Sequence, residues 1–297
     1  MSSTARAFFL FVILFFALSP PARAGRVECS AVKSAVMGHT VRYCAMLPPT
    51  YDTEKTRRYP VLYYLHGLFE NEQTFVDFGG WNLLEELQDS GRVGEYLVVI
   101  PNGGQSFYVN SKDGRQRYED FFVREFLPAM EKKYRIQAGR ATRGIAGVSM
   151  GGYGALHMAF KYPQLFVSVS AHSAALIENI PATMPAGAGR LQARLAVLGD
   201  VFGRPFDRTY WEQNNPLTMA KQSNGLARLK IYFDCGTEDE YNFDAGAKAL
   251  HEALKKRGIA HEFHLYPGGH GPIYLAEHVE ATFEFHSKAF GIGKAAK

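Results

Sequence analysis

The sequence predicts an α/β fold, in which a mostly parallel sheet is covered by helices on both faces. Short β-rich runs alternate with stretches of helical period along most of the chain. The 297 residues are 46% hydrophobic and rich in Phe and Tyr, which is enough for one large core. No internal repeat or low-complexity tract divides them. We therefore expect a single domain.

The alternation gives seven strands and five helices. The predicted strands are Val41–Leu47, Pro60–His66, Tyr96–Ile100, Arg143–Val148, Phe166–Ala171, Leu229–Asp234 and Glu262–Tyr266. The predicted helices are Trp81–Asp89, Asp120–Tyr134, Met150–Lys161, Phe243–Arg257 and Ile273–Phe290. Pro128 falls inside the second helix and should kink or split it, because proline has no N–H to donate.

The first 24 residues read as a cleaved export signal. Arg6 supplies a positive charge, Phe8–Leu18 is an unbroken apolar run, and Ala22–Ala24 has the small-x-small cleavage pattern. Eleven apolar residues are too few for a permanent span, which needs about 20. We expect that cleavage leaves a mature protein of residues 25–297, and that this protein has no permanent membrane span. An uncleaved N-terminal anchor is the alternative.

Charge argues against nucleic acid as a partner. The full chain has 33 basic and 29 acidic residues, and loss of Arg6 and Arg23 with the signal leaves 31 and 29, a formal charge of +2. A near-neutral chain without a basic stripe is a poor binder of a phosphate backbone.

The cysteines predict one disulfide. Cys29 and Cys44 flank a turn near Met37–His39, and in a hairpin centred there they would face each other on neighbouring strands. An exported protein can keep such a bond. Cys235 is left over, and we interpret it as a small buried residue at a strand end.

The alternation of strands and helices fails over residues 174–225, where prolines and glycines separate short helical fragments. Because this stretch follows a strand near the motif described next, we expect an insertion that forms a partial cap over that edge of the sheet. A structured crossover that does not contact substrate is the alternative.

The most informative motif is Gly147–Gly151, a G-x-S-x-G sequence between a predicted strand and a predicted helix. In a nucleophile elbow the serine occupies a sharp strand-to-helix turn, and the glycines let strand and helix approach closely. The motif alone is weak, and its placement is the stronger signal. It makes Ser149 a candidate nucleophile.

A serine hydroxyl needs a base, and the base needs an acid, in the chain order Ser, acid, His on this kind of sheet. His270 lies on a glycine-flanked loop after the last strand, and Glu238, Asp239 and Glu240 follow the strand before it. The residues alone leave the choice of acid open.

Other uses of the histidines and glycines fit less well. His261 and His264 lie near His270 but alternate poorly with it, which argues against a metal site. We expect His66 to shape a loop and His172 to line the pocket. Gly152 and Gly154 do not complete G-x-G-x-x-G, because His157 stands at the last position. No metal or organic cofactor is predicted.

An oxyanion formed on attack needs two backbone donors, one from the residue after the nucleophile and one from the loop after the strand Pro60–His66. These are the N–H groups of Met150 and Leu68. Backbone geometry should therefore matter more than side-chain identity at both positions.

Together these motifs resemble the esterase D-like group of α/β-hydrolases. The resemblance is carried by Pro60–Gly67, Pro101–Gly104, Gly147–Ala155, Asp234–Asp239 and Gly269-His270, and it runs from about Leu47 to the final helix. The group includes S-formylglutathione hydrolases, feruloyl and acetylxylan esterases, and mycolyltransferases.

The resemblance implies an α/β-hydrolase fold with Ser149 as nucleophile, Asp239 as acid and His270 as base. It implies Phe107 and Tyr108 as pocket-lining aromatics, and ordinary packing is the alternative for both.

Two further details come with the resemblance. Glu119 and Asp120 are expected to cap the following helix. Gly271-Pro272-Ile273 departs from the aromatic that many relatives carry shortly after the histidine.

We expect an exported serine carboxylesterase, periplasmic or secreted, whose partner is a small-molecule or carbohydrate-linked ester. One alternative is acyl transfer to a sugar or lipid alcohol on the same triad. Less favoured alternatives are an S-formylglutathione-type thioester hydrolase, which the export signal disfavours, and a non-catalytic binding protein on the same fold.

Overall fold

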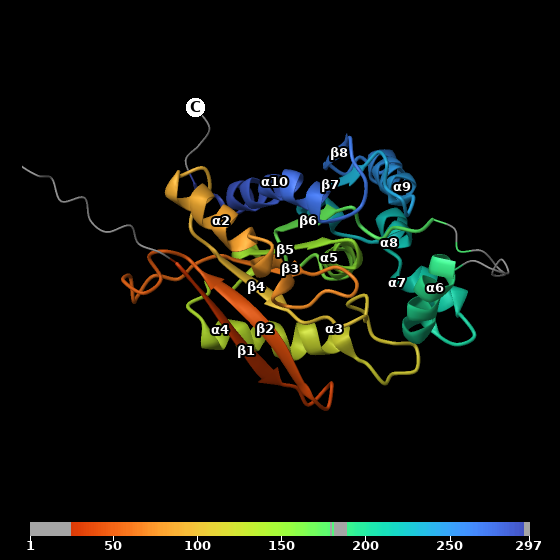
Figure 1. Ribbon diagram of the computed structural model, residues 1–297, viewed down its shortest axis with the longest axis horizontal. Coiled ribbons are helices and arrows are strands. Elements are labelled where there is room, and N and C mark those ends of the chain that lie inside the picture. The colour runs from red at the N-terminus through yellow and green to blue at the C-terminus, as the bar shows by residue number, and fades with distance from the viewer. Residues whose placement is uncertain (1–24, 179, 181–188, 294–297) are drawn as a thin grey trace, which may run out of the picture.

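The computed structural model describes residues 25–178, 180 and 189–293. The predicted signal, residues 1–24, lies outside this part of the chain. An eight-stranded sheet runs in the order β1-β2-β4-β3-β5-β6-β7-β8. β1 and β2 pair antiparallel, β2 pairs antiparallel with β4, and all later neighbours are parallel. The predicted class, a mostly parallel sheet with helices, is confirmed (Figure 1).

The strands follow the expected order, with one addition at the edge. They are β1 (Arg26–Lys33), β2 (Thr40–Leu47), β3 (Val61–Leu65), β4 (Leu97–Pro101), β5 (Arg143–Val148), β6 (Ser168–His172), β7 (Lys230–Gly236) and β8 (Glu262–Tyr266). Every residue of β3, β4 and β6 is buried, as expected for parallel strands covered on both faces.

Two apolar clusters sandwich the sheet. One face carries α1 (Thr74–Asp77), α2 (Gly80–Asp89) and α10 (Pro272–Phe290), with Leu84, Leu87 and Phe283 in its core. The other carries α5 (Met150–Lys161), α9 (Phe243–Lys256) and the segment from α3 to α4. The sheet lies between these two layers of helices (Figure 1).

The helix expected over Asp120–Tyr134 is divided. It consists of α3 (Tyr118–Phe121), a π-helical stretch η1 (Phe122–Phe126) and α4 (Leu127–Lys133). Pro128 stands in the first turn of α4, where a missing N–H costs nothing. The helix is therefore divided near Pro128, as predicted, and the division is the π-helical stretch that ends just before α4.

Glu119 does not cap α3, because neither it nor Asp120 makes a side-chain cap hydrogen bond there. Its buried carboxylate instead accepts hydrogen bonds from Lys161 and Tyr162 and contacts Nε2 of His157 at 2.8 Å. The expectation of a cap was wrong because partners from α5 reach the carboxylate across the fold.

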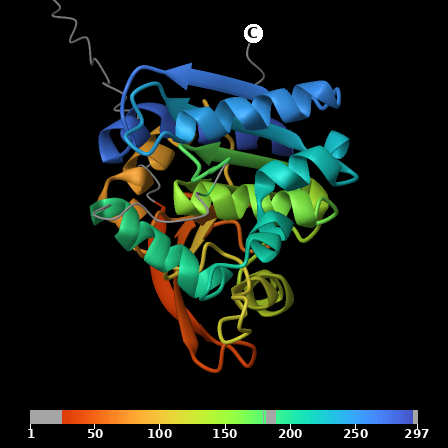
Figure 2. The same ribbon diagram turned by 90° about the vertical axis from the view of Figure 1, so that its right-hand side faces the viewer.

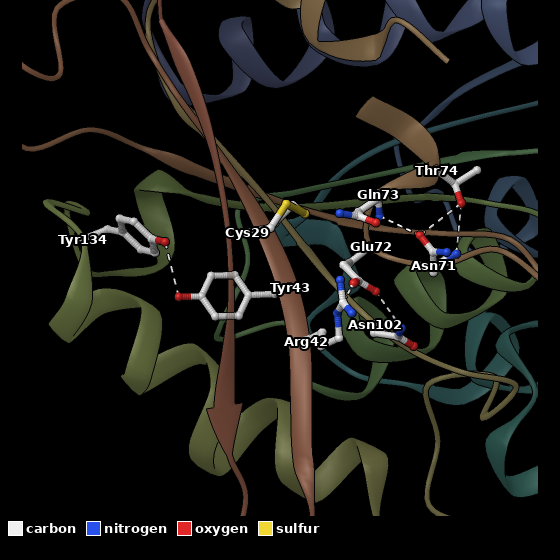
Figure 3. Close-up of a disulfide and its surroundings, with 10 residues drawn as sticks. Cys29, Arg42, Tyr43, Asn71, Glu72, Gln73, Thr74, Asn102 and Tyr134 are labelled. Atoms are coloured by element: carbon white, nitrogen blue, oxygen red, sulfur yellow. Dashed lines mark hydrogen bonds and ion pairs between the residues drawn. A yellow bond between two sulfur atoms is a disulfide. The ribbon is translucent and has the colours of Figure 1, made fainter. Parts of the chain in front are cut away.

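The N-terminal strands form the hairpin predicted from the cysteines. Cys29 and Cys44 are direct partners in the β1–β2 register and form a disulfide, which confirms that prediction. Figure 3 shows the bond beside an ion pair of Glu72 with Arg42, and Asn102 donates to the same carboxylate at 2.6 Å. Glu72 thus ties the loop after β3 to β2 and to the end of β4.

Three helices occupy the stretch after β6: α6 (Gly189–Phe202), α7 (Arg208–Asn214) and α8 (Pro216–Gln222). α8 packs against α5 and α9. Figure 2 shows α6 and α7 in front of the α5 layer. None of the helices among residues 25–178 and 189–293 combines the length and apolarity needed to cross a bilayer.

Candidate active site

Ser149 occupies a strained turn between β5 and α5. Its φ of 54° and ψ of −116° lie in a region that residues with a side chain rarely adopt. Two main-chain bonds hold this conformation, because the N–H of Ser149 donates to the carbonyl of His172 and its carbonyl accepts from the N–H of Ala175, both at 2.9 Å. The hydroxyl is thereby presented at the carboxyl edge of the sheet.

The glycines around Ser149 are required by close backbone contacts. A Cβ on Gly147 would lie 2.3 Å from backbone atoms of Gly151, and one on Gly151 would lie 1.9 Å from the carbonyl oxygen of Leu65. The start of α5 therefore presses directly against β5 and the end of β3, as the motif predicted.

His270 reaches Ser149 from the loop between β8 and α10. Its Nε2 lies 3.0 Å from Oγ of Ser149, and its Nδ1 lies 2.8 Å from Oδ2 of Asp239. With the proton on Nδ1 donated to the carboxylate, Nε2 is free to accept the serine proton. The structure thus brings together the three residues predicted from distant parts of the chain.

Asp239 is the buried member of the acidic run, whereas Glu238 and Glu240 are exposed. Its Oδ1 accepts from the N–H of Tyr241 at 2.9 Å, and the thiol of Cys235 lies 3.5 Å from Oδ2. Burial alone would raise the pKa of Asp239, but the hydrogen bond and charge of His270, with the main-chain donors, lower it below its usual value. The carboxylate is therefore held charged next to the imidazole.

Glu240 has a separate task in the same turn. Its carboxylate accepts the main-chain N–H of His270 at 2.7 Å, and so fixes the loop rather than the ring. The rings of Tyr241 and Phe243 contact the His270 ring edge-on, with centroids 4.6 and 5.4 Å away. Of the three acids Glu238–Glu240, Asp239 therefore orients the His270 ring, and Glu240 fixes the loop that carries it.

Leu68 and Met150, the predicted oxyanion donors, both line the cavity that contains Ser149. Met150 is the first residue of α5, where a main-chain N–H has no carbonyl partner within the helix. The Leu68 loop is held by Glu70, whose Oε2 accepts the N–H of Gly67 at 2.8 Å. Burial raises the pKa of this carboxyl above its ordinary value.

His66 shapes the same region without touching Ser149. Its Nε2 accepts the N–H of Gly103 at 2.8 Å, and its Nδ1 lies 2.8 Å from the carbonyl of Gly67. Burial lowers the pKa of His66, which keeps the ring neutral and able to accept at one nitrogen. The expectation that His66 shapes a loop agrees with these contacts.

The two aromatic candidates differ in position. Phe107 lines the cavity and contacts Tyr153 edge-on. Tyr108 is fully buried, donates its hydroxyl to the carbonyl of His66 at 3.0 Å, and is not among the described residues that line the cavity. The structure therefore places Tyr108 in packing rather than in the cavity wall, because its hydroxyl is bonded to the main chain and its ring packs edge-on against Tyr118.

His172 is also displaced from its expected place. It is fully buried behind Ser149, with Nδ1 2.8 Å from Oδ2 of Asp234 and Nε2 2.6 Å from Oγ1 of Thr282. The expectation that His172 lines the pocket was wrong, because its side chain points into the layer under α10. It supports the elbow through its main-chain carbonyl instead.

The cavity itself has a volume of about 580 Å³. One wall comes from α1, α2 and α10, and the other from Phe107, the start of α9 and the segment after β6. Ile177, Ile180 and Leu198 belong to that last segment. Within the described part of the chain, no group of three or more His, Cys, Asp or Glu could hold a metal ion.

The sequence analysis did not identify Glu70 or Cys235 as parts of this site, and it considered Glu240 only as a candidate acid, not as the acceptor of the His270 main-chain N–H. The run of three acids was a signal for Glu240, since only one of them can face the histidine. Glu70 and Cys235 carried no signal, because their contacts depend on how the loops fold back.

Comparison with known proteins places the chain among esterases. Residues 34–281 match the family model Esterase, described as "Putative esterase". Esterase Rv1288 of Mycobacterium tuberculosis is 33% identical over 248 residues, which are 76% of this chain and 51% of that protein. The chain thus spans about half the length of this relative. An acetyl esterase of Caldicellulosiruptor saccharolyticus is 30% identical over 232 residues, 76% of this chain and 83% of that protein.

Solved structures agree. A ferulic acid esterase gives a TM-score of 0.77 at 28% identity, covering 90% of this chain and 99% of its own. An S-formylglutathione hydrolase from Agrobacterium tumefaciens gives 0.70 at 20% identity, covering 92% and 99%, which is a likeness of fold alone. On the strength of the family match, the chain belongs to the Esterase family and has the α/β-hydrolase fold.

Proposed function

We propose that the chain is a serine carboxylesterase that hydrolyses carboxylic esters through an acyl-enzyme on Ser149. The observation that carries the proposal is the pair of contacts from His270, 3.0 Å to Oγ of Ser149 and 2.8 Å to Oδ2 of Asp239. Relatives named as esterases support the same reaction.

The geometry suits a two-step reaction. As Oγ of Ser149 attacks the ester carbonyl, Nε2 of His270 takes the serine proton, and Asp239 stabilises the imidazolium. The N–H groups of Leu68 and Met150 receive the oxyanion. His270 then gives the proton to the departing alcohol. A water molecule, deprotonated by His270, attacks the acyl-enzyme and releases the acid, and the proton returns to Ser149.

Two further expectations join this proposal. Residues 174–225 act as a partial cap, supported by Ile177, Ile180 and Leu198 in the cavity wall. The protein is exported, supported by the signal-like pattern of residues 1–24 and by the Cys29–Cys44 disulfide. Ser173 is a second serine that lines the cavity, and the proposal assigns it no catalytic role.

Ser149→Ala tests the mechanism directly. Removal of the nucleophile should lower hydrolysis of p-nitrophenyl butyrate by up to ~10⁶-fold, as in other triad enzymes. A fluorophosphonate probe should label wild type and Ser173→Ala at Ser149, and should not label Ser149→Ala. Turnover of Ser149→Ala within tenfold of wild type, or a label on Ser173, would overturn the assignment.

A further inference from the structure

The most exposed large apolar side chains among the described residues gather at one place. Phe69, Phe78 and Ile273 are 72%, 69% and 78% exposed. Phe69 and Phe78 line the catalytic cavity, and Ile273 stands between Pro272 and Tyr274, which also line it. We call these three exposed residues the apolar rim. An exposed apolar group around a cavity mouth marks a surface that meets a partner.

Phe69 is held outward by a strained backbone. Its φ of 66° is rare for a residue with a side chain, and the turn before it is closed by the bond from Gly67 N–H to Glu70. Phe69 directly follows Leu68, a candidate oxyanion donor. A partner that covers Phe69 therefore contacts the residue next to the main-chain N–H that would receive the oxyanion.

The cavity behind the rim is apolar as well. Its walls include Phe75, Leu83, Ile177, Ile180, Leu198 and Leu275. Among the described residues that line the cavity, Glu70 carries the one carboxyl group and His270 the one imidazole. None of these lining residues is Lys or Arg. Such a wall suits an uncharged ester and offers nothing to an anionic one.

The surroundings of the rim carry negative charge. Asp77 and Glu277 are exposed next to it, and segments 66–80 and 270–279 contain no Lys or Arg. A rim of this charge would be repelled by an anionic membrane, which basic residues normally recruit. It is compatible with a neutral surface.

We propose that the natural substrate is a water-insoluble, uncharged lipid ester, and that the apolar rim inserts into the surface of a neutral lipid aggregate that presents it. This rests on the proposed function and names its substrate class. A protein or a second copy of the chain on the rim would seal the mouth above Ser149. A lipid surface instead delivers the ester into the cavity without a passage through water.

Binding can be measured without turnover by using the full chain with Ser149→Ala. This variant should float with triolein droplets coated with phosphatidylcholine. Adding Ile273→Ser should weaken droplet binding roughly tenfold, because one buried Ile side chain is lost from the interface. Ile273→Leu, which keeps the apolar surface, should float like the parent. Absence of flotation, or equal flotation of Ile273→Ser, would overturn the proposal.

Kinetics give a second test. The rate on tributyrin should rise steeply where its concentration passes the solubility limit, and the ratio of emulsified to dissolved rates should fall about tenfold in Ile273→Ser. Hydrolysis of dissolved p-nitrophenyl butyrate without droplet binding overturns this inference alone. Failure on every ester overturns the proposed function. A monomer–dimer equilibrium that Ile273→Ser abolishes would give the rim to a second copy and overturn the lipid assignment.

Discussion

The imidazole of His270 is fixed from several sides before any substrate arrives. Asp239 orients the ring, Glu240 holds its main chain, and the rings of Tyr241 and Phe243 close on its edges. These contacts come from the turn that follows β7 and from the first residue of α9. Pre-organisation of this kind would spare the proposed reaction the cost of orienting its base.

Asp239→Asn should reduce kcat on p-nitrophenyl butyrate by up to ~10⁴-fold, because an amide stabilises the wrong tautomer of the histidine. Glu238→Gln is the matched control, since Glu238 is exposed in the same turn and Asp239, rather than Glu238, contacts the ring. Steady-state kinetics on both variants check this. A large loss in Glu238→Gln instead would transfer the acid role to that residue.

Glu70 should act through the loop that it holds. Glu70→Gln keeps an oxygen that can accept the N–H of Gly67, so kcat should stay near that of wild type. Glu70→Ala removes the acceptor and should lower kcat by about 10–100-fold, less than outright loss of an oxyanion donor. If kcat falls equally in both variants, the charge of Glu70 near His270 determines the effect, rather than the hydrogen bond to Gly67.

Site residues whose expected roles impose a local pattern could be picked out from the sequence, and the structure brings them together. Ser149 needs glycines two positions either side, and His270 stands on a glycine-flanked loop, so both were visible. Tyr108 and His172 were misplaced because the direction of a side chain depends on neighbours that the sequence does not specify locally. Their burial is decided by the layers under α5 and α10.

At the scale of elements, the helix Met150–Lys161 and the strands Arg143–Val148 and Glu262–Tyr266 were predicted to the residue. β1 (Arg26–Lys33) was absent from the predicted strands, because it lies at the edge and most of its residues are partly or fully exposed. Only the cysteine spacing pointed to its hairpin. The one-turn helix α1 was missed because four residues give no period.

Glu119 links α3 to α5, and this link should depend on pH. Burial opposes its charge, but His157 and Lys161 outweigh burial and lower the pKa of Glu119 to about 2. Because this folded-state pKa lies below the ordinary one, the stabilisation is present above about pH 4.5 and is lost as pH falls toward 2. Glu119→Gln should cost about 3 kcal/mol at pH 7 and less than half as much at pH 3.

Urea unfolding of wild type and Glu119→Gln at both pH values measures this difference. Asp77→Asn, which removes an exposed acid on the opposite face, serves as the control and should change little at either pH. A cost for Glu119→Gln that is the same at pH 7 and pH 3 would show that packing, rather than charge, accounts for its effect.

On the scale of the whole molecule, the Cys29–Cys44 disulfide closes the β1–β2 edge. Its loop spans 15 residues, and a loop of that size contributes roughly 3 kcal/mol by restricting the unfolded chain. A Cys29→Ala/Cys44→Ala variant should lose about that much unfolding free energy in urea while still hydrolysing ester. Reduced wild type should match it, and an unchanged unfolding midpoint in either sample would contradict the prediction.

The opposite edge of the sheet has a different character. β8 is partly exposed along its length and leads straight into the loop of His270, while Cys235, the remaining cysteine, is buried and forms no disulfide. The disulfide therefore joins the two strands at one end of the eight-stranded sheet, whereas the loop that carries His270 leaves the strand at the other end. If His270 is the base, fraying confined to the last strand would abolish activity while the rest of the molecule stays folded, so activity and global stability could be lost separately.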